Sequence, residues 1–320
     1  KTGDGTFTVS SIGGANGDLV SILNARTDRG ASGDGIKWEL NGDTTGGNYL
    51  DQELEGADTT VTAQGRTNTL RNCLPSNSIS DTEAFGAAVF QFVNFSDGSN
   101  DRAANILAGH HADSSTSEVN ATTARWNNTA AITALKLSPR EGTNFKTDSM
   151  LSTYAVPKNL IARQELSGTL TTVTFASIPQ TYDHLELHCY FRTDRPSSTA
   201  EATLVSLNGD TTTANYDAQQ LRGGGSSVSA VSEAASRFIG LAPATSATAN
   251  QFGTVSATFY NYTKTDRHKH FLVVAGCVIS EEQFIDSRSH RWEDTDAITS
   301  ITLVSSTGND FIAGCVFELR

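Results

Sequence analysis

Hydrophobic and polar residues alternate along much of the chain, and this pattern predicts β-strands. In residues 185–191 every second side chain is apolar, and those between are Glu, His and Tyr. A period of two over such a stretch is typical of a strand with one buried face. Strands are also predicted through the even positions of residues 36–40, matched by the odd positions of 203–207, and through the even positions of 88–92, matched by the odd positions of 255–259. A short helix is predicted only near residues 232–237.

Several of these segments occur twice at a nearly constant spacing. LNGDTT occupies residues 40–45 and 207–212, RTDR residues 26–29 and 192–195, and W-x-x-T-x-A-I-T residues 126–133 and 292–299. The offsets are 207−40 = 167, 192−26 = 166 and 292−126 = 166. A register held over this distance predicts a tandem duplication of a whole domain. The predicted boundaries are residues 1–156 for the first copy, 157–169 for a linker and 170–320 for the second copy.

The predicted fold class is all-β, with two jelly-roll-like antiparallel β-sandwich domains. Each half has about eight strand patterns and frequent Gly, Asn and Asp turn signals, as sandwiches do. Asn-Gly-Asp after residues 36–40 and 203–207 is a strong turn signal, since Asn and Gly tolerate positive φ. The polar regions 56–82 and 223–249 are predicted to be long loops. A closed barrel is the alternative.

The charge balance argues against nucleic acid and anionic membranes as partners. The net charge is −12, shared equally, because residues 1–160 carry 12 basic and 18 acidic groups and residues 161–320 carry 11 and 17. An acidic surface repels phosphate groups. The longest apolar run, residues 271–279, has nine residues, which is too short for a membrane span.

The polar positions that recur in both halves are the first candidates for chemistry. They are Arg26/Arg192, Asp28/Asp194, Arg29/Arg195, Asp43/Asp210 and, less strictly, Asp34/Glu201. All of them fall beside predicted turns, where Asp accepts hydrogen bonds from the backbone. We therefore expect turn and packing roles. A cation site built from loop oxygens is the alternative, although no EF-hand pattern is present.

Other candidates occur in one half only. Glu39, Glu53 and Glu55 would form a glycosidase-type acid pair if they converged in space. His110-His111 and the RHKH segment at residues 267–270 are the histidine concentrations, and the second is predicted to be an exposed hairpin tip. Trp126 and Trp292 are expected to be core anchors. We predict no catalytic residue, no cofactor and no metal, and therefore no enzyme.

The four cysteines, Cys73, Cys189, Cys277 and Cys315, show no CxxC spacing and are predicted to be buried free thiols. A Cys277–Cys315 disulfide is the alternative, which requires two neighbouring strands.

The combination of motifs resembles a known family. F-x-x-I-P-x-T-Y-x-x-L at residues 175–185, LNGDT-x-x-x-NY at 207–216, the Trp motif at 292–299 and a closing F-x-L at 317–319 are similar to a β-rich unit of tailed-bacteriophage structural proteins. This unit recurs in phages of marine and cyanobacterial hosts. The first copy matches from LNGDT onward but has Gly13-Gly14 where the family usually has Pro.

The resemblance implies a non-enzymatic virion protein. We expect an outer-surface capsid decoration that docks on other virion proteins and forms a homo-oligomer, with a trimer favoured. The alternative is a tail or tail-fibre component that binds a host surface glycan.

Overall fold

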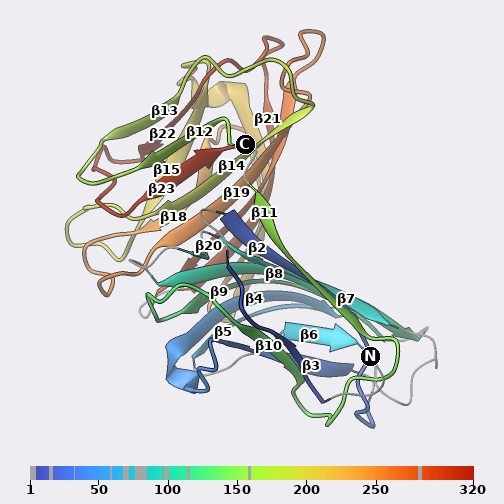
Figure 1. Cartoon of the computed structure of the whole chain (residues 1–320). Helices are drawn as coiled ribbons and strands as arrows, with labels where there is room; N and C mark the ends of the chain where they lie inside the picture. The colour runs from blue at the N-terminus through green and yellow to red at the C-terminus, as the bar shows by residue number, and fades with distance from the viewer. Residues whose placement is uncertain are drawn as a thin grey trace. The chain divides into compact units, whose positions relative to one another are not determined.

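The computed structural model is built almost entirely of β-strands, with two 3-10 helices, η1 (Gly46–Asn48) and η2 (Thr213–Asn215), and no α-helix among the residues it describes. Those residues are 5–13, 17–31, 33–57, 60–67, 72–75, 85–93, 95–96, 101–113, 116–157, 160–279 and 283–320. The chain divides into two compact units, Lys1–Lys158 and Asn159–Arg320. Each unit is an antiparallel sandwich of a larger and a smaller sheet (Figure 1).

The first unit has a smaller sheet of four strands and a larger sheet of seven. In spatial order, the smaller sheet is β1 (Phe7–Val9), β10 (Leu135–Pro139), β3 (Gly33–Leu40) and β6 (Asn72–Pro75). The larger sheet is β11 (Met150–Pro157), β2 (Gly17–Ala25), β7 (Gly86–Phe92), β8 (Arg102–Asp113), β9 (Thr116–Trp126), β4 (Tyr49–Ala57) and β5 (Thr60–Thr67).

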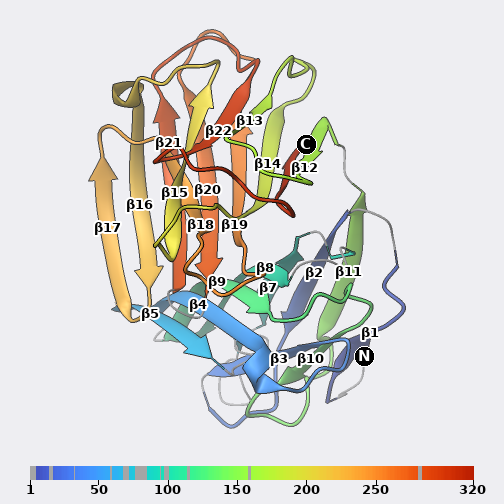
Figure 2. The ribbon, with the colours of Figure 1, turned by 90° about the vertical axis from the view of Figure 1, so that its left-hand side faces the viewer.

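The second unit has sheets of eight and four strands. The larger is β12 (Ala162–Glu165), β23 (Val316–Leu319), β14 (His184–Phe191), β19 (Gly253–Tyr260), β20 (Lys269–Val278), β21 (Gln283–Trp292), β16 (Tyr216–Gly224) and β17 (Ser227–Glu233). The smaller is β13 (Thr172–Phe175), β22 (Ile301–Ser305), β15 (Ala200–Leu207) and β18 (Phe238–Pro243). Figure 2 shows the strands from β19 to β17 side by side.

Strands at equivalent sequence positions occupy the same places in the two units, apart from β12, which has no counterpart in the described part of the first unit. The common origin of the two halves remains a prediction. The predicted linker 157–169 is wrong as a separate connector, because Pro157 ends β11 and residues 162–165 form β12 within the second sandwich. The division between the units falls inside this segment, after Lys158.

Alternating apolar side chains from both sheets form the core of each sandwich. In the first unit Leu23 and Phe90 of the larger sheet meet Ile36 and Leu137 of the smaller one, all with 0% exposure. Trp126 is 1% exposed, as predicted for a core anchor. It is the last residue of β9.

Three expectations about secondary structure are wrong. The described residues form eleven strands in the first unit and twelve in the second, not about eight in each. The polar regions predicted as loops contain β5 and β6 in one unit and β17 and β18 in the other. The helix predicted near residues 232–237 is instead the end of β17 followed by a bend. The prediction depended on regular apolar–polar alternation, which short strands such as SVSAVSE in β17 and FIGLAP in β18 lack.

Candidate functional site

The LNGD tetrapeptide of each unit forms a tight turn at the end of a smaller-sheet strand. In the first unit the N–H of Asp43 donates to the carbonyl three residues earlier at 2.9 Å, and Asn41 and Gly42 have φ values of 51° and 75°. Two successive positive φ values define a type I′ turn, which Asn and Gly adopt at little cost. Asn208 and Gly209 repeat it with 52° and 76°. The predicted turns are confirmed.

The carboxylate of Asp43 ties this turn to two other segments. Its Oδ2 accepts hydrogen bonds from Trp126 Nε1 at 2.7 Å and Asn48 Nδ2 at 2.8 Å, and its Oδ1 accepts from the N–H of Thr45 at 2.9 Å. The Tyr49 hydroxyl donates to the Asp43 carbonyl at 2.9 Å. Since β3 belongs to the smaller sheet and Trp126 to the larger, these bonds hold the turn after β3 against the end of β9 and so connect the two sheets.

Asp210 makes the same contacts in the second unit. It accepts from Trp292 Nε1 at 2.8 Å, Asn215 Nδ2 at 2.9 Å and the N–H of Thr212 at 2.9 Å, and Tyr216 donates to its carbonyl at 3.1 Å. Burial raises the pKa of each aspartate, but the hydrogen bonds from the Trp, Asn and Thr outweigh it and hold both pKa values below the usual 3.8. Both side chains are therefore ionised acceptors that stabilise the fold.

Asp28 and Asp194, the aspartates of RTDR, each bind the loop that follows a smaller-sheet strand, β10 in the first unit and β22 in the second. Oδ1 of Asp28 accepts from the N–H groups of Thr143 at 2.7 Å and Asn144 at 3.0 Å. Oδ1 of Asp194 accepts from the N–H of Asp310 at 2.8 Å. The predicted turn and packing role is confirmed for both.

The arginines of RTDR also bind backbone. Arg192 is 7% exposed, and its guanidinium donates to four carbonyls at 2.8–3.0 Å, those of Ala244, Ala247, Thr248 and Gln251. Arg29 donates to a carbonyl four residues on at 2.6 Å. Arg26 and Arg195 each accept a main-chain hydrogen bond through their own carbonyls, and Arg26 is buried.

Asp34 and Glu201, the less strict pair, each bind the loop that follows β10 or β22 in their own unit. The carboxylate of Asp34 accepts from the N–H groups of residues 141 and 142 at 3.0 Å. Glu201 accepts from the N–H of Thr307 at 3.3 Å and from Asn309 Nδ2 at 3.1 Å. No group of three or more His, Cys, Asp or Glu in the described ranges is arranged to hold a metal ion.

The three glutamates considered for a glycosidase-type site do not converge. Successive side chains of a strand point to opposite faces. Glu53 and Glu55 follow Tyr49 at even spacing on β4, so they share its inner face, whereas Glu39 follows the buried Trp38 by one residue and lies on the outer face of β3. The hypothesis of a site with all three acids is wrong.

Each of these acids has its own neighbours. Glu39 pairs with Lys37 at 3.0 Å and Lys136 at 3.2 Å. Glu53 forms an ion pair with Arg66. Burial, followed by the charges of Glu118 and Glu53, raises the pKa of Glu55.

A second inward polar cluster lies in the other unit, and no sequence motif indicated it. Asp286 accepts two hydrogen bonds from Arg222 at 2.7 and 2.8 Å and one from Gln220 at 2.6 Å, while Arg288 donates to Glu233 at 2.8 Å. The strands β16, β17 and β21 bring these residues together from distant positions. The one available signal was that Gln220 and Arg222 replace Glu53 and Glu55 in the repeat register.

The histidines lie apart from one another. Arg267 and His268 lie at the end of the hairpin loop that joins β19 to β20 and are exposed, as predicted, whereas Lys269 and His270 begin β20. Lys269 is 1% exposed and donates to the carbonyls of Arg267 and Thr295 at 3.0 and 2.8 Å. His110 is buried on β8, and the side chain of His111 is outside the described part of the structure.

Three cysteines are confirmed as buried free thiols, namely Cys189, Cys277 and Cys315. The alternative disulfide between Cys277 and Cys315 is therefore wrong. Burial raises the pKa of Cys315 to about 12, so its thiol stays protonated. The side chain of Cys73 is outside the described part.

A hollow of ≈ 330 Å³ opens between the edges of β1 and β11 and is lined by residues 7–9 and 149–152. These residues carry no His, Cys or charged group. The hollow therefore offers hydroxyl and apolar contacts, and its lining contains no general base that could activate a hydroxyl as a nucleophile.

Comparisons with known proteins do not assign the chain to a family. No family model matches the chain, and no curated protein matches it. Among solved structures, domains LG4–5 of the mouse laminin α1 chain align at 13% identity and a TM-score of 0.17, covering 100% of this chain and 88% of that one. Transferrin-binding protein B of Neisseria meningitidis aligns at 6% identity and a TM-score of 0.10, covering 77% of each chain. TM-scores this low support no inference. No helix in the described residues is long and apolar enough to cross a membrane.

Proposed function

We propose that the chain is a non-enzymatic structural protein of a tailed-bacteriophage virion, and that it docks on other virion proteins through an apolar sheet face. The motifs that resemble phage structural proteins support the virion assignment. The contacts of the shared residues support a structural role, since Asp43, Asp210, Asp28 and Asp194 all stabilise turns and crossings.

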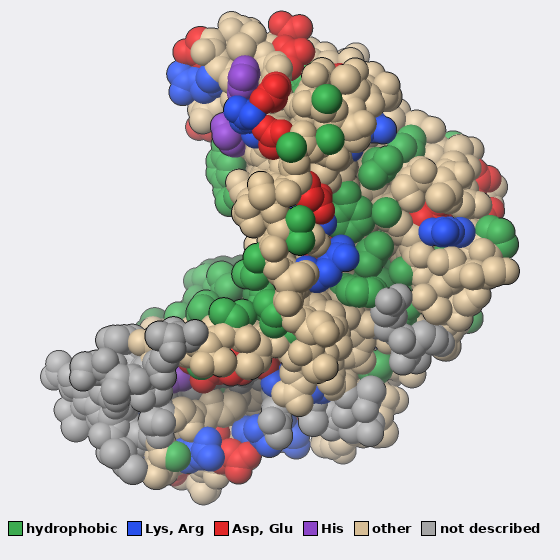
Figure 3. Space-filling model, turned by 180° about the vertical axis from the view of Figure 1, so that it is seen from behind, with side chains coloured by type: hydrophobic (Ala, Val, Ile, Leu, Met, Phe, Trp, Pro, Cys, Tyr) green, Lys and Arg blue, Asp and Glu red, His purple; other side chains and the backbone are tan. Residues whose placement is uncertain are grey.

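The observation that carries the docking proposal is the outer face of the larger sheet in the first unit. Ile22, Val89 and Leu107 are direct neighbours on β2, β7 and β8, and they are 43%, 38% and 58% exposed. Further exposed apolar side chains on this sheet are Val61, Val119, Met150 and Tyr154. The space-filling view shows hydrophobic side chains gathered on this unit (Figure 3).

Single exposed apolar residues are normal, but a contiguous patch marks an interaction surface. Complete burial of a Leu side chain contributes about 1.5–3 kcal/mol. Leu107 retains more than half of its surface in water and so has about 1 kcal/mol or more to gain on docking. Several such side chains together provide the core of a protein–protein interface.

The proposed location is the outer surface of the capsid, and the proposed partners are other virion proteins of the capsid or tail. Proteins of this kind work as symmetric oligomers. The trimer expected from the sequence remains a prediction.

Two measurements test the proposal. Mass spectrometry of purified phage particles is expected to find peptides of this chain, and their absence from particles would refute the virion assignment. Docking is tested by adding purified protein to particles that lack it. Leu107→Lys is expected to reduce the bound fraction at least tenfold, at limiting protein, through the loss of about 1.4 kcal/mol or more.

The matched control is Leu272→Lys, the same change on the outer face of β20 in the second unit, where Leu272 is 48% exposed. It is expected to bind like the wild type. Equal binding by the Leu107→Lys protein would exclude this face as the docking surface.

The alternative is a tail or tail-fibre component that binds a host glycan. The observation in its favour is Tyr260, which is 44% exposed and paired on its two sides with His184 and His270, both exposed. An aromatic face with polar neighbours suits stacking on a sugar ring. A glycan array would support this role if Tyr260→Ala abolished a signal given by the wild type.

A further inference from the structure

The outermost strand of the larger sheet in the first unit has an open edge. β11 pairs over all eight residues with β2, and it is the last strand of that sheet among the residues described. About half of the residues of an antiparallel strand direct their N–H and C=O groups away from the partner. β11 therefore presents a row of main-chain donors and acceptors along its free side.

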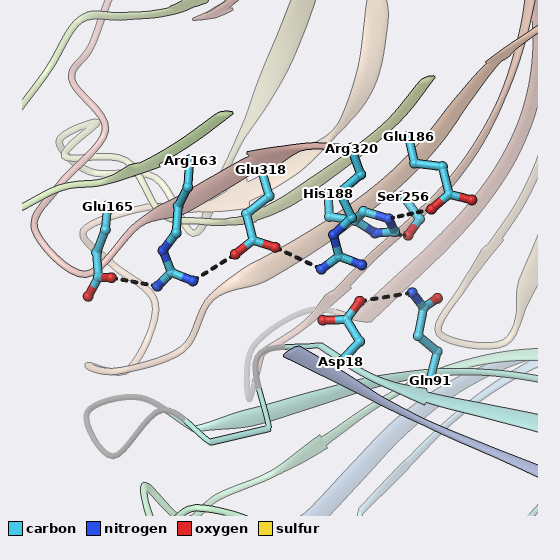
Figure 4. Close-up of polar contacts among 9 residues, drawn as sticks. All are labelled: Asp18, Gln91, Arg163, Glu165, Glu186, His188, Ser256, Glu318 and Arg320. Atoms are coloured by element: carbon cyan, nitrogen blue, oxygen red, sulfur yellow. Dashed lines mark hydrogen bonds and ion pairs between the residues drawn. The ribbon is translucent and has the colours of Figure 1, made fainter. Parts of the chain in front are cut away.

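The equivalent edge in the second unit is covered. β23 pairs with β14 on one side and with β12 on the other. Arg163 of β12 donates to Glu318 of β23 at 2.7 Å, and Arg320 donates to the same carboxylate at 2.7 Å (Figure 4). Val316 beside β12 is 5% exposed, whereas Met150 at the equivalent register position of β11 is 61% exposed.

β11 also lacks the charges found on comparable edges. Its sequence, MLSTYAVP, contains no charged residue. The other edge strands of the larger sheets do: β5 contains Arg66, β12 contains Arg163 and Glu165, and β17 contains Glu233. Charged residues on an edge strand oppose pairing with another molecule. In a protein of net charge −12, an uncharged edge is where two copies can approach with least repulsion.

We propose that β11 pairs antiparallel with β11 of a second copy of this chain about a twofold axis, so that two seven-stranded sheets become one. An extended, uncharged strand can pair with a copy of itself, because each copy offers the N–H donors and C=O acceptors that the other needs. A register centred on Ser152 places Met150 of each copy opposite Tyr154 of the other, and these side chains are 61% and 54% exposed. Sulfur–aromatic contacts of this kind are favourable.

This contact is isologous and closes with two copies. It therefore competes with the trimer expected from the sequence, and the oligomeric state decides between them. The inference concerns the isolated chain in solution and does not rest on the proposed role in a virion.

Sedimentation equilibrium of the full chain tests the pairing. The wild type is expected to be a concentration-dependent dimer, and Tyr154→Lys is expected to raise the dimer dissociation constant by at least about tenfold, since it replaces two apolar contacts across the axis with charges. Val61→Lys is the matched control, because Val61 is 53% exposed on β5, the opposite edge strand of the same sheet. It is expected to leave the dissociation constant unchanged.

Circular dichroism checks that both variants fold, and hydrogen exchange gives a second readout. The amides of residues 150–156 that face the free edge are expected to become protected as the dimer fraction rises. A wild-type monomer at every concentration, a trimer, or a dimer weakened as much by Val61→Lys as by Tyr154→Lys would overturn the inference.

Discussion

Replacing Asp43 with Ala removes an acceptor at which three segments of the first unit meet. The side chains of Trp126 and Asn48 and the N–H of Thr45 all donate to this carboxylate at 2.7–2.9 Å. The change creates no new contact and leaves the backbone of the turn to Asn41 and Gly42. Its effect therefore measures how much the crossing between the two sheets depends on one side chain.

The expected loss is about 3 kcal/mol in the free energy of unfolding. A hydrogen bond to a charged group contributes about 1.5–3 kcal/mol, and contributions within one network are not additive. Asn48 and Thr45 lie where water can replace the carboxylate. Trp126 is 1% exposed, so its indole N–H would stay buried without a partner, at a cost of about 1–3 kcal/mol.

Differential scanning calorimetry at pH 7 gives the readout. A domain of this size loses about 2–4 °C in Tm per kcal/mol, so the first unit is expected to melt about 6–12 °C lower. Asp210→Ala is expected to have the same effect on the second unit. Asp43→Asn keeps one oxygen acceptor and should fall between Asp43→Ala and the wild type. Asp266→Ala, in an exposed loop, should leave both transitions unchanged.

The dependence on pH has a definite sign. Hydrogen bonds hold the pKa of Asp43 in the folded chain below 3.8, so its contribution is complete above the unfolded value and is lost as the pH falls through the folded one. The difference in Tm between the wild type and Asp43→Ala should therefore narrow below about pH 4. An Asp43→Ala protein that melts with the wild type at pH 7 would refute this account of the motif.

Three further predictions can each be checked by one measurement. Arg192→Lys should cost about 2 kcal/mol by urea unfolding, because an ammonium cannot reach four carbonyls in the plane of a guanidinium, while Arg29→Lys, at a half-buried position, should cost less. His290 should titrate by NMR near its lowered pKa of about 4, which burial and the charge of Arg288 produce, so its contribution to stability falls as the pH drops from 6.5 towards 4. In a Cys73→Ser protein without reductant, a thiol reagent should label no cysteine in the native state and three after unfolding; a count of one would mean that a disulfide had formed.

Local sequence predicted those parts of the fold that depend on neighbouring residues. The alternation in residues 185–191 identified β14, because Leu185, Leu187 and Phe191 share the face that packs in the core, each with 0% exposure. Asn41-Gly42 and Asn208-Gly209 predicted their turns, because these residues adopt positive φ at little cost. The repeated aspartates were correctly expected beside turns, because an Asp carboxylate accepts hydrogen bonds from nearby backbone N–H groups. β17 was missed because serines occur on both of its faces, and β5, β6 and β18 were missed because none of them alternates over enough residues, as NCLP in β6 and FIGLAP in β18 show.

The sequence by itself therefore determined an all-β chain, the positions of its turns and the repetition of its structural residues, since each depends on period or on backbone preference within a few residues. Only the tertiary structure decided which side chains meet. It separated Glu39 from Glu53 by the face of the strand, brought Asp286 to Arg222, and joined Asp43 to Trp126 across 83 residues of sequence. It also covered the edge of β23 with β12 and left β11 open within the described residues. Contacts of this kind depend on strand order and on which face is buried, and neither is encoded in any single segment.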